Sequence, residues 1–212
     1  ISIDISSGIY ASTGVSSNIT IQSKETVTFG YPKIGHFLSN GYKKTGKLSI
    51  YDIGHKSYPE INNINLVKEN DILDMIPPID ISSHKYSKGK VVSISGSGSY
   101  SGAGILNTSA SVSAGSGIVK HIYDSSLLSI ISRNLEVIDI PLNGREGVLN
   151  LNNYSDIEEH LEWATSLTIG PGLPDSISSI DLTKKILSNF KGPTVIDGGG
   201  LLAINNPAVF KK

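Results

Sequence analysis

The chain has 212 residues, a length that suits one full domain or two partial ones. Hydrophobic residues make up 38% of it and charged residues 17%, which indicates a globular rather than a disordered protein. Eighteen basic and 19 acidic side chains give a net charge of -1, too little positive charge to favour nucleic acid or an anionic membrane as a partner. Cysteine is absent, which excludes disulfides and a thiol nucleophile and agrees with a cytoplasmic location.

The first residues do not have the charged-then-apolar order that is typical of a signal peptide, and no apolar run has the length of a membrane span. The chain opens on Ile1 and its single methionine is Met75, so we expect a fragment or a processed chain. Residues 1–5, 26–29 and 47–52 are rich in alternating or β-branched residues and predict strands, with no long helix between them.

A connector is predicted over residues 57–82. This stretch holds Pro59, the pair Pro77-Pro78 and several Asn and Asp residues, and it leaves room for one short helical turn around residues 67–75. We therefore place a domain boundary here.

After Lys90 the sequence alternates between short apolar runs, glycine-rich turns and helical stretches. This order predicts βαβ units, a parallel sheet and helices on both faces of that sheet, so the fold class is α/β. The predicted strands are residues 91–95, 117–122, 135–140, 166–169 and 194–197, and the predicted helices are residues 103–114, 125–132, 155–164 and 176–189.

Three glycine turns follow predicted strands. Gly96–Gly102 precedes a helix, Ile169–Pro174 ends a strand, and Asp197–Gly200 follows the last predicted strand. Because the carboxyl ends of parallel strands meet at one edge of a sheet, these turns are expected to share a cleft in which backbone N–H groups face an anion. Neither the strict dinucleotide fingerprint nor a P-loop is present, and each turn alone is also explained as a tight connection.

Two carboxylates lie at predicted strand ends. Asp197 could bind a hydroxyl or a hydrated cation, or cap the helix that follows. Asp4 is followed by Ser6, Ser7 and Gly8, a weaker form of the same pattern. The five histidines have no metal-ligand spacing, and the Gly-x-Ser-x-Gly elbow is missing, which excludes metalloprotease and serine-hydrolase chemistry.

Seven motifs in one order give the chain a resemblance that spans residues 1 to about 206. They are Ile3-Asp4-Ile5-Ser6-Ser7-Gly8, Val27-Thr28-Phe29-Gly30-Tyr31-Pro32-Lys33-Ile34-Gly35, Asp52-Ile53-Gly54, Ser83-His84-Lys85, Tyr100-Ser101-Gly102-Ala103, Ile169-Gly170-Pro171-Gly172 and Val195-Ile196-Asp197. In this set the chain resembles the bifunctional NAD(P)H-hydrate repair enzymes. The resemblance implies the end of a Rossmann-like epimerase domain in residues 1–56, a linker in 57–82, and the first part of a ribokinase-like α/β/α dehydratase domain in 83–212.

The resemblance also implies an activity. In this family an epimerase domain interconverts the two epimers of hydrated NADH or NADPH, and a dehydratase domain removes water from one of them with ADP, or ATP, as cofactor. The resemblance implies a potassium ion as a second cofactor and NAD(P)H-hydrate as the small-molecule partner. Whether the protein forms a homo-oligomer is left open.

The resemblance also implies roles for residues of this chain that match the family's motifs. Asp4 matches the family's acid that contacts the hydrated nucleotide, and Ser7 matches the hydroxyl that helps to hold potassium. Ala103 and Gly172 match positions that line the dehydratase substrate site. Gly102 and Asp197 are further candidates for that site. His84 and Lys85 match a motif that opens the dehydratase domain, without an assigned role.

Several positions depart from the family pattern. Ser6 replaces a proline and Pro174 replaces a glycine, while Gly199 and Leu202 replace an Asp and an Asn. The family's catalytic Asp and much of its ADP site are expected beyond Lys212, and the epimerase nucleotide site before Ile1. We therefore expect no catalytic residue of the dehydratase within these 212 residues, and little activity from the chain alone.

Two alternatives remain from the sequence. A ribokinase-like kinase acting on a vitamin or sugar alcohol would share the glycine turns but would not explain the segment with Asp4 and Ser7. A noncatalytic nucleotide-binding module is the other alternative, favoured by the three glycines that follow Asp197.

Overall fold

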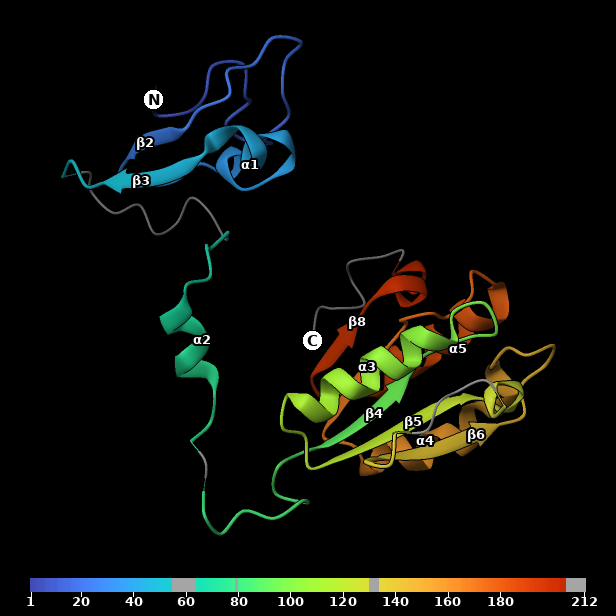
Figure 1. Cartoon of the computed structure of the whole chain (residues 1–212). Helices are drawn as coiled ribbons and strands as arrows, with labels where there is room; N and C mark the ends of the chain where they lie inside the picture. Colours follow the sequence, from blue (N-terminus) through green and yellow to red (C-terminus); the bar gives the residue numbers. More distant parts are fainter. Residues whose placement is uncertain (55–63, 79, 130–133, 205–212) are drawn as a thin grey trace. The chain divides into compact units, whose positions relative to one another are not determined.

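The computed structural model describes residues 1–54, 64–78, 80–129 and 134–204 (Figure 1). The chain divides into two compact units, Ile1–Ile76 and Pro77–Lys212, and each is described by itself. The division falls inside the stretch where the sequence analysis places a connector. Within the described residues, no helix has the length and apolar character needed to cross a membrane.

The first unit is built on a three-stranded parallel sheet in the order β1-β2-β3. These strands are β1 (Ser2–Ile3), β2 (Glu25–Phe29) and β3 (Lys47–Tyr51), so the three predicted strands are confirmed with shorter bounds for the first and last. A 3-10 turn, η1 (Ile34–His36), and helix α1 (Ser39–Thr45) connect β2 to β3. Helix α1 was not predicted from the sequence; it has two turns and is followed by Gly46, whose positive φ of +66° favours glycine.

The buried face of β2 is polar. Thr26 and Thr28 are fully buried, and Thr26 Oγ1 donates a hydrogen bond to the carbonyl oxygen of Thr45 at 2.7 Å. Parallel pairing of β1 with β2 sets Ile3 beside Val27, which brings the residue after β1, Asp4, to the end of β2.

The short helix α2 (Glu69–Met75) confirms the helical turn predicted in the connector, and all of its residues are exposed.

The second unit is built on a five-stranded parallel sheet in the order β6-β5-β4-β7-β8. Its strands are β4 (Lys90–Ile94), β5 (Ile118–Asp124), β6 (Val137–Leu142), β7 (Ser166–Ile169) and β8 (Thr194–Ile196). Its helices are α3 (Ser101–Ser113), α4 (Tyr154–Trp163) and α5 (Ile177–Asn189), and its 3-10 turns are η2 (Ser125–Leu127), η3 (Leu151–Asn153) and η4 (Gly198–Ala203). The predicted parallel α/β architecture is confirmed.

Two details of the prediction need correction. The helix expected over residues 125–132 is the single turn η2 in its described part, and residues 130–133 lie outside the described residues. Strand β6 runs two residues further than expected and includes Pro141, which an edge strand tolerates because it pairs on one side only.

The two faces of this sheet differ in chemistry. Helices α4 and α5 cover one face, and α3 covers the other (Figure 1). The α4 and α5 side holds the main apolar core, in which Val92, Ile94 and Ile122 pack against residues such as Ile157 and Ile186. Burying each such side chain contributes about 1.5–3 kcal/mol, so this face supplies most of the apolar stabilisation of the unit.

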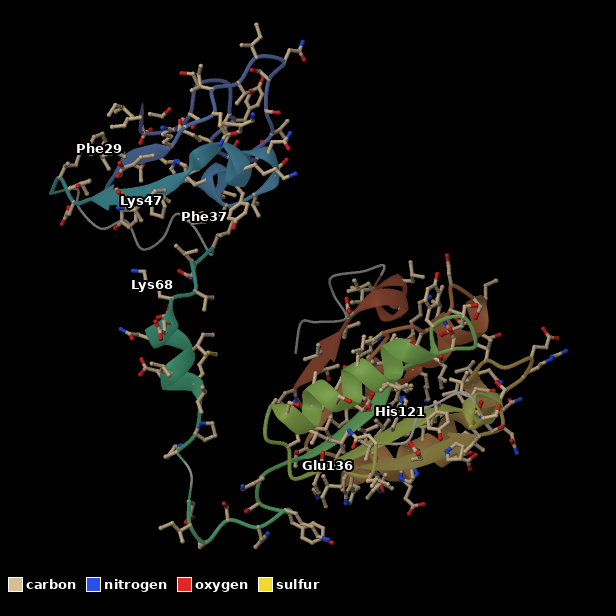
Figure 2. All side chains as sticks on the ribbon, viewed as in Figure 1. Phe29, Phe37, Lys47, Lys68, His121 and Glu136 are labelled. Atoms are coloured by element: carbon tan, nitrogen blue, oxygen red, sulfur yellow. The ribbon has the colours of Figure 1, made fainter. Side chains whose placement is uncertain are left out.

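The face under α3 is polar. Asn107 Nδ2 donates to Ser93 Oγ at 2.8 Å and to Thr168 Oγ1 at 2.5 Å. Ser93 Oγ and Ser95 Oγ share a hydrogen bond of 2.8 Å, and His121 Nε2 lies 3.0 Å from the carbonyl oxygen of Ser95. Figure 2 shows His121 between the sheet and α3. Hydrogen bonds, rather than apolar contact, therefore fix much of this helix against the sheet.

Candidate functional site

Asp4 has an unusual backbone at the end of β1. Its φ of +66° lies in the left-handed region, where a side chain is disfavoured. Its N–H donates to the carbonyl oxygen of Val27 at 2.6 Å, and its own carbonyl oxygen lies 2.8 Å from His36 Nε2. The conformation is thus held from both sides.

The Asp4 carboxylate is held by two residues from the β2 region. Asp4 Oδ1 accepts hydrogen bonds from Lys33 Nζ and, at 3.0 Å, from Thr28 Oγ1. Lys33 Nζ also donates to Thr28 Oγ1 at 2.8 Å, which closes a triangle of polar groups. The hydrogen bond from Lys33 is the main reason that the pKa of Asp4 lies below its ordinary value, so this carboxyl is ionised at neutral pH.

His36 is the fourth residue of this cluster, and it binds backbone groups of Lys33 and Asp4. Its Nδ1 accepts from the backbone N–H of Lys33 at 3.1 Å, so its Nε2 carries the proton that is donated to the carbonyl oxygen of Asp4. Burial lowers the pKa of His36, in agreement with this neutral form. Because both ring nitrogens bind the backbone, His36 is not free for acid–base work.

Ser6 and Ser7 follow Asp4 but face different surroundings. Ser6 is buried, and its hydroxyl is bonded to Ser23 Oγ at 2.8 Å and donates to the carbonyl oxygen of Lys44 at 3.1 Å, which explains how a serine is accommodated where the family has proline. Ser7 is exposed, and its carbonyl oxygen already accepts from the N–H of Ile21. The Ser7 side chain is therefore open to solvent and offers one hydroxyl oxygen.

Asp4 and Ser7 were predicted as site residues of this unit, whereas the partners of Asp4 were not. Thr28, Lys33 and His36 lie 24 to 32 residues after Asp4 and meet it through parallel strand pairing. Thr28 and Lys33 stand in a motif that the sequence analysis quoted for the family resemblance. Their meeting depends on the register of β1 and β2, which the motif alone does not reveal.

In the second unit the three predicted glycine turns meet at the carboxyl edge of the sheet. The N–H of Gly96 donates to the carbonyl oxygen of Pro171 at 2.8 Å, and the N–H of Asp197 donates to that of Ile169 at 3.1 Å. A Cβ on Gly170, whose φ is +116°, would overlap the carbonyl oxygen of Asp197. Backbone thus packs directly on backbone, as the strand order β4-β7-β8 requires.

Ala103 and Gly172 lie side by side. A Cβ on Gly172 would lie 2.8 Å from the Cβ of Ala103 and 2.8 Å from the carbonyl oxygen of Tyr100. Gly102 is exposed, and nothing described lies within 4 Å of where its Cβ would be. The structure therefore brings Ala103 and Gly172 together and leaves Gly102 at an open surface beside them.

Asp197 lies at the same edge with an exposed side chain. It precedes η4, but its carboxylate does not cap that turn. A Cβ on Gly199, two residues later, would overlap the carbonyl oxygen of Leu173. A family-like Asp at position 199 would therefore require the 170–174 turn to move, so the departure at Gly199 is matched by tight packing around it.

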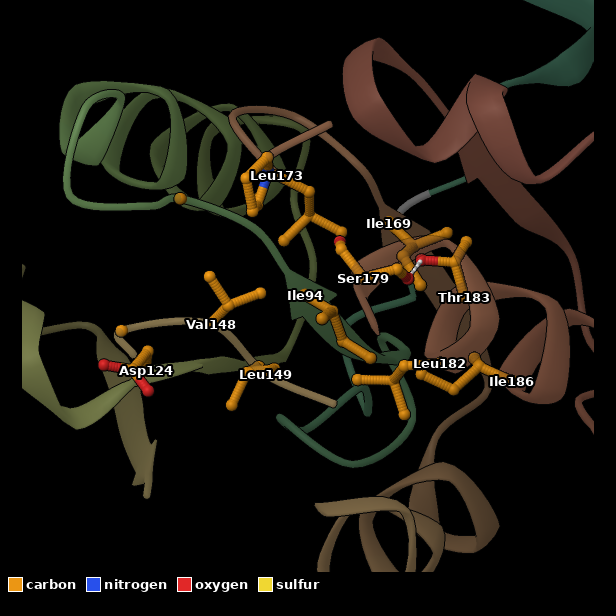
Figure 3. A pocket seen from close by; sticks show the side chains of 13 residues that line it. Ile94, Asp124, Val148, Leu149, Ile169, Leu173, Ser179, Leu182, Thr183 and Ile186 are labelled. Carbon is orange, nitrogen blue, oxygen red and sulfur yellow. Dashed lines mark hydrogen bonds between the residues drawn. The ribbon is translucent and has the colours of Figure 1, made fainter. Parts of the chain in front are cut away.

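A pocket lies behind these turns, between the sheet and α5 (Figure 3). Its walls are mainly apolar and include Ile94, Ile169 and Leu173. Asp124, which is 5% exposed, also lines it and accepts hydrogen bonds from the N–H groups of Ser126 at 3.0 Å and Gly144 at 2.9 Å. Asp124 thus ties two loops together; it was missed because strand β5 was expected to end at Ile122.

His84 and Lys85 lie in a turn before β4. The ring nitrogen Nδ1 of His84 accepts from the N–H of Ser87 at 3.2 Å, and the side chains of His84 and Lys85 are exposed. A Cβ on Gly117 would overlap the carbonyl oxygen of Lys85, so this turn packs closely on the start of β5. The contacts of His84 and Lys85 are structural.

The parallel sheet and its strand-end turns define an α/β protein of the ribokinase-like class. A ribokinase-like superfamily protein from Enterococcus faecalis V583 matches 66% of this chain and 50% of its own, with a TM-score of 0.50 and 24% identity. The ADP/ATP-dependent NAD(P)H-hydrate dehydratase from Bacillus subtilis, co-crystallised with ATP and Mg²⁺, matches 66% of this chain and 47% of its own, with a TM-score of 0.51 and 20% identity. At these identities the two structures show the fold alone.

The sequence gives the narrower assignment. A family described as NAD(P)H-hydrate dehydratase matches residues 91–212, more than half of the chain, and the chain belongs to this family. The identification made from the seven motifs is confirmed.

Curated relatives extend the similarity to both units. The bifunctional NAD(P)H-hydrate repair enzyme Nnr of Moorella thermoacetica is 30% identical over 209 residues, which are 96% of this chain and 39% of the relative. The enzyme of the same name from Thermofilum pendens is 30% identical over 210 residues, and that from Escherichia coli K12 is 27% identical over 209. The chain spans about two fifths of the length of these relatives.

Proposed function

We propose that the protein repairs hydrated nicotinamide nucleotides, with the second unit taking part in nucleotide-dependent dehydration of NAD(P)H-hydrate. The observation that carries the proposal is the family match over residues 91–212, which covers the turns that bring Ala103 against Gly172. The relatives that match both units are named as bifunctional repair enzymes.

The dehydration has a defined balance. The terminal phosphoryl group of ADP or ATP would pass to the hydroxyl on carbon 6 of the hydrate, and the proton of that hydroxyl would be released to solvent. The C–O bond would then break with loss of phosphate, which takes up the proton that leaves the neighbouring carbon as the double bond forms. The products are NAD(P)H, inorganic phosphate and the nucleotide shortened by one phosphate. The N–H groups of Gly96, Gly170 and Asp197 already donate to backbone carbonyl oxygens, so any stabilisation of the charge on phosphate oxygens is assigned to other backbone N–H groups of these turns.

The small residues at the edge of the sheet are suited to a flat ring. Ala103 and Gly172 present little side chain, so a ring could approach the backbone there, and Gly102 and the exposed Asp197 border the same surface. We propose these four residues as substrate contacts. No residue among the described ones is assigned as the catalytic acid or base of the dehydration.

The first unit is proposed to contribute to epimerisation of the hydrate. Its ionised Asp4 offers a carboxylate to a hydroxyl or amide of the ligand, and Ser7 offers one oxygen to a potassium ion. No step is assigned to the ion. A cytoplasmic location, inferred from the absence of cysteine, belongs to this proposal.

The test is regeneration of NADH from its hydrate, followed by absorbance with ADP or ATP and potassium present. We would assay this chain and the longest version of the protein that contains it. Ala103→Leu is expected to lower kcat/KM at least tenfold, because the larger side chain would occupy the surface beside Gly172. Leu106→Ala, an exposed position on the same helix, is the control and should leave kcat/KM unchanged.

Two results would overturn the proposal. Phosphorylation of a vitamin or sugar alcohol without hydrate turnover would identify a ribokinase-like kinase. Nucleotide binding without any turnover by the folded, longest version would identify a noncatalytic binding module.

A further inference from the structure

The two carboxylate oxygens of Asp4 are used unequally. Oδ1 accepts from both Thr28 and Lys33, whereas no residue in the described part of the chain donates to Oδ2. The side chain of Asp4 is 48% exposed and that of Lys33 is 28% exposed. Lys33 therefore lies deeper than Asp4, and Oδ2 remains accessible to a ligand.

The backbone of Asp4 leaves the carboxylate little freedom. The left-handed φ is disfavoured for a residue with a side chain, and the hydrogen bonds from His36 and to Val27 hold it in place. Such strain persists where the surroundings fix it, and it is often found at ligand sites. The carboxylate is thus positioned by contacts that precede any ligand.

Lys33 has a role here that neither Thr28 nor His36 can fill. Lys33 and His36 are the charged or titratable groups that act on Asp4 among the described residues, and His36 is neutral with both nitrogens engaged. Lys33 is the single cation of the cluster, and its Nζ binds both Asp4 and Thr28. It links the strand that carries Thr28 to the turn that carries Asp4.

We propose that Lys33 is a positioning residue of this site, which holds Asp4 Oδ1 with Thr28 so that Oδ2 is presented to a hydroxyl or amide group of the ligand. The choice of hydrated nicotinamide as that ligand rests on the proposed function. A carboxylate fixed in this way accepts hydrogen bonds and donates none, so it selects donor groups.

The experiment compares Lys33→Met and Lys33→Arg with the parent in the longest version of the protein. Interconversion of the two hydrate epimers is measured across the acidic pH range, and the Asp4 carboxyl is titrated by NMR. Lys33→Met is expected to lower kcat/KM at least tenfold and to move both the acid limb of activity and the Asp4 titration to higher pH, because the cation that lowers the pKa of Asp4 is gone. Lys33→Arg keeps the charge and should recover part of the loss.

Lys24→Met removes an exposed lysine from the same unit and serves as the matched control with unchanged profiles. If Lys33→Met does not fold, Lys33→Gln keeps a donor without the charge and carries the same expectation. Folded variants that leave the pH profile and the Asp4 titration unmoved would overturn the role of Lys33. A parent that does not interconvert the epimers, while its Asp4 titration still depends on Lys33, would instead overturn the proposed function.

Discussion

The two candidate sites of this chain are built in opposite ways. The site in the first unit consists of side chains, in which Lys33 and Thr28 hold the Asp4 carboxylate. The site in the second unit is defined by missing side chains, since Gly170 and Gly172 pack where a Cβ would collide. The first should respond to changes in charge, and the second to changes in volume.

The largest effect on stability is expected from added volume at Gly170. In Gly170→Ala the new Cβ would overlap the carbonyl oxygen of Asp197 at a φ of +116°. Backbone strain and overpacking together should lower the free energy of unfolding of the second unit by about 3 kcal/mol, measured by chemical denaturation. Gly98→Ala, with no described atom within 4 Å, is the control and should change it by less than about 0.5 kcal/mol. Equal losses of unfolding free energy in the two variants would contradict the expectation that added volume is costly at Gly170 in particular.

A smaller loss is expected from the polar face under α3, where the second unit does use side chains. Asn107→Ala removes the donor to Ser93 and Thr168 and leaves buried hydroxyls without it. The expected cost is about 1–3 kcal/mol in the free energy of unfolding, again by denaturation. Asn189→Ala removes an exposed amide that binds Lys185 within its own helix and should cost less than about 0.5 kcal/mol. A cost at Asn107 no larger than at Asn189 would show that this network adds no stability.

The smallest effect is a pH dependence that originates at His121. Burial lowers the pKa of His121 below its ordinary value of 6.5, so the unfolded chain binds a proton there more readily than the folded one. The contribution of neutral His121 to the free energy of unfolding is therefore fully present above pH 6.5. It is lost as the pH drops from that value toward the lower pKa of the folded state. The free energy of unfolding measured between pH 7 and pH 5 should fall less steeply in His121→Gln, which cannot ionise. An unchanged slope in His121→Gln would contradict the assignment.

Much of the second unit could be predicted from the sequence because its signals are local. Apolar runs bounded by glycine located β4 and β7, and parallel pairing then placed the turns after them at one edge. The meeting of Ala103 with Gly172 follows from that topology. The helix expected over 125–132 is wrong in its described part, residues 125–129, because apolar residues in a serine-rich stretch do not distinguish a helix from a single turn.

The partners of Asp4 could not be predicted in the same way. Lys33 lies 29 residues from Asp4, and their contact depends on strand register and on a left-handed backbone at Asp4. Neither property is expressed in the local pattern of residues. The polar face under α3 is a similar case, since Ser93 and Ser95 read as ordinary alternation until the partner Asn107 is placed opposite them.

That polar face also restricts how the second unit can change over evolution. Apolar surfaces tolerate small sliding movements and single replacements of similar size, whereas directed hydrogen bonds are satisfied in one alignment only. Ala103 lies in the first turn of helix α3, so a shift of the helix along the sheet would also displace this residue from Gly172. Substitutions at Asn107, Ser93 and Thr168 are therefore expected to be accepted together rather than one at a time, with the alignment of the helix conserved through the exchange.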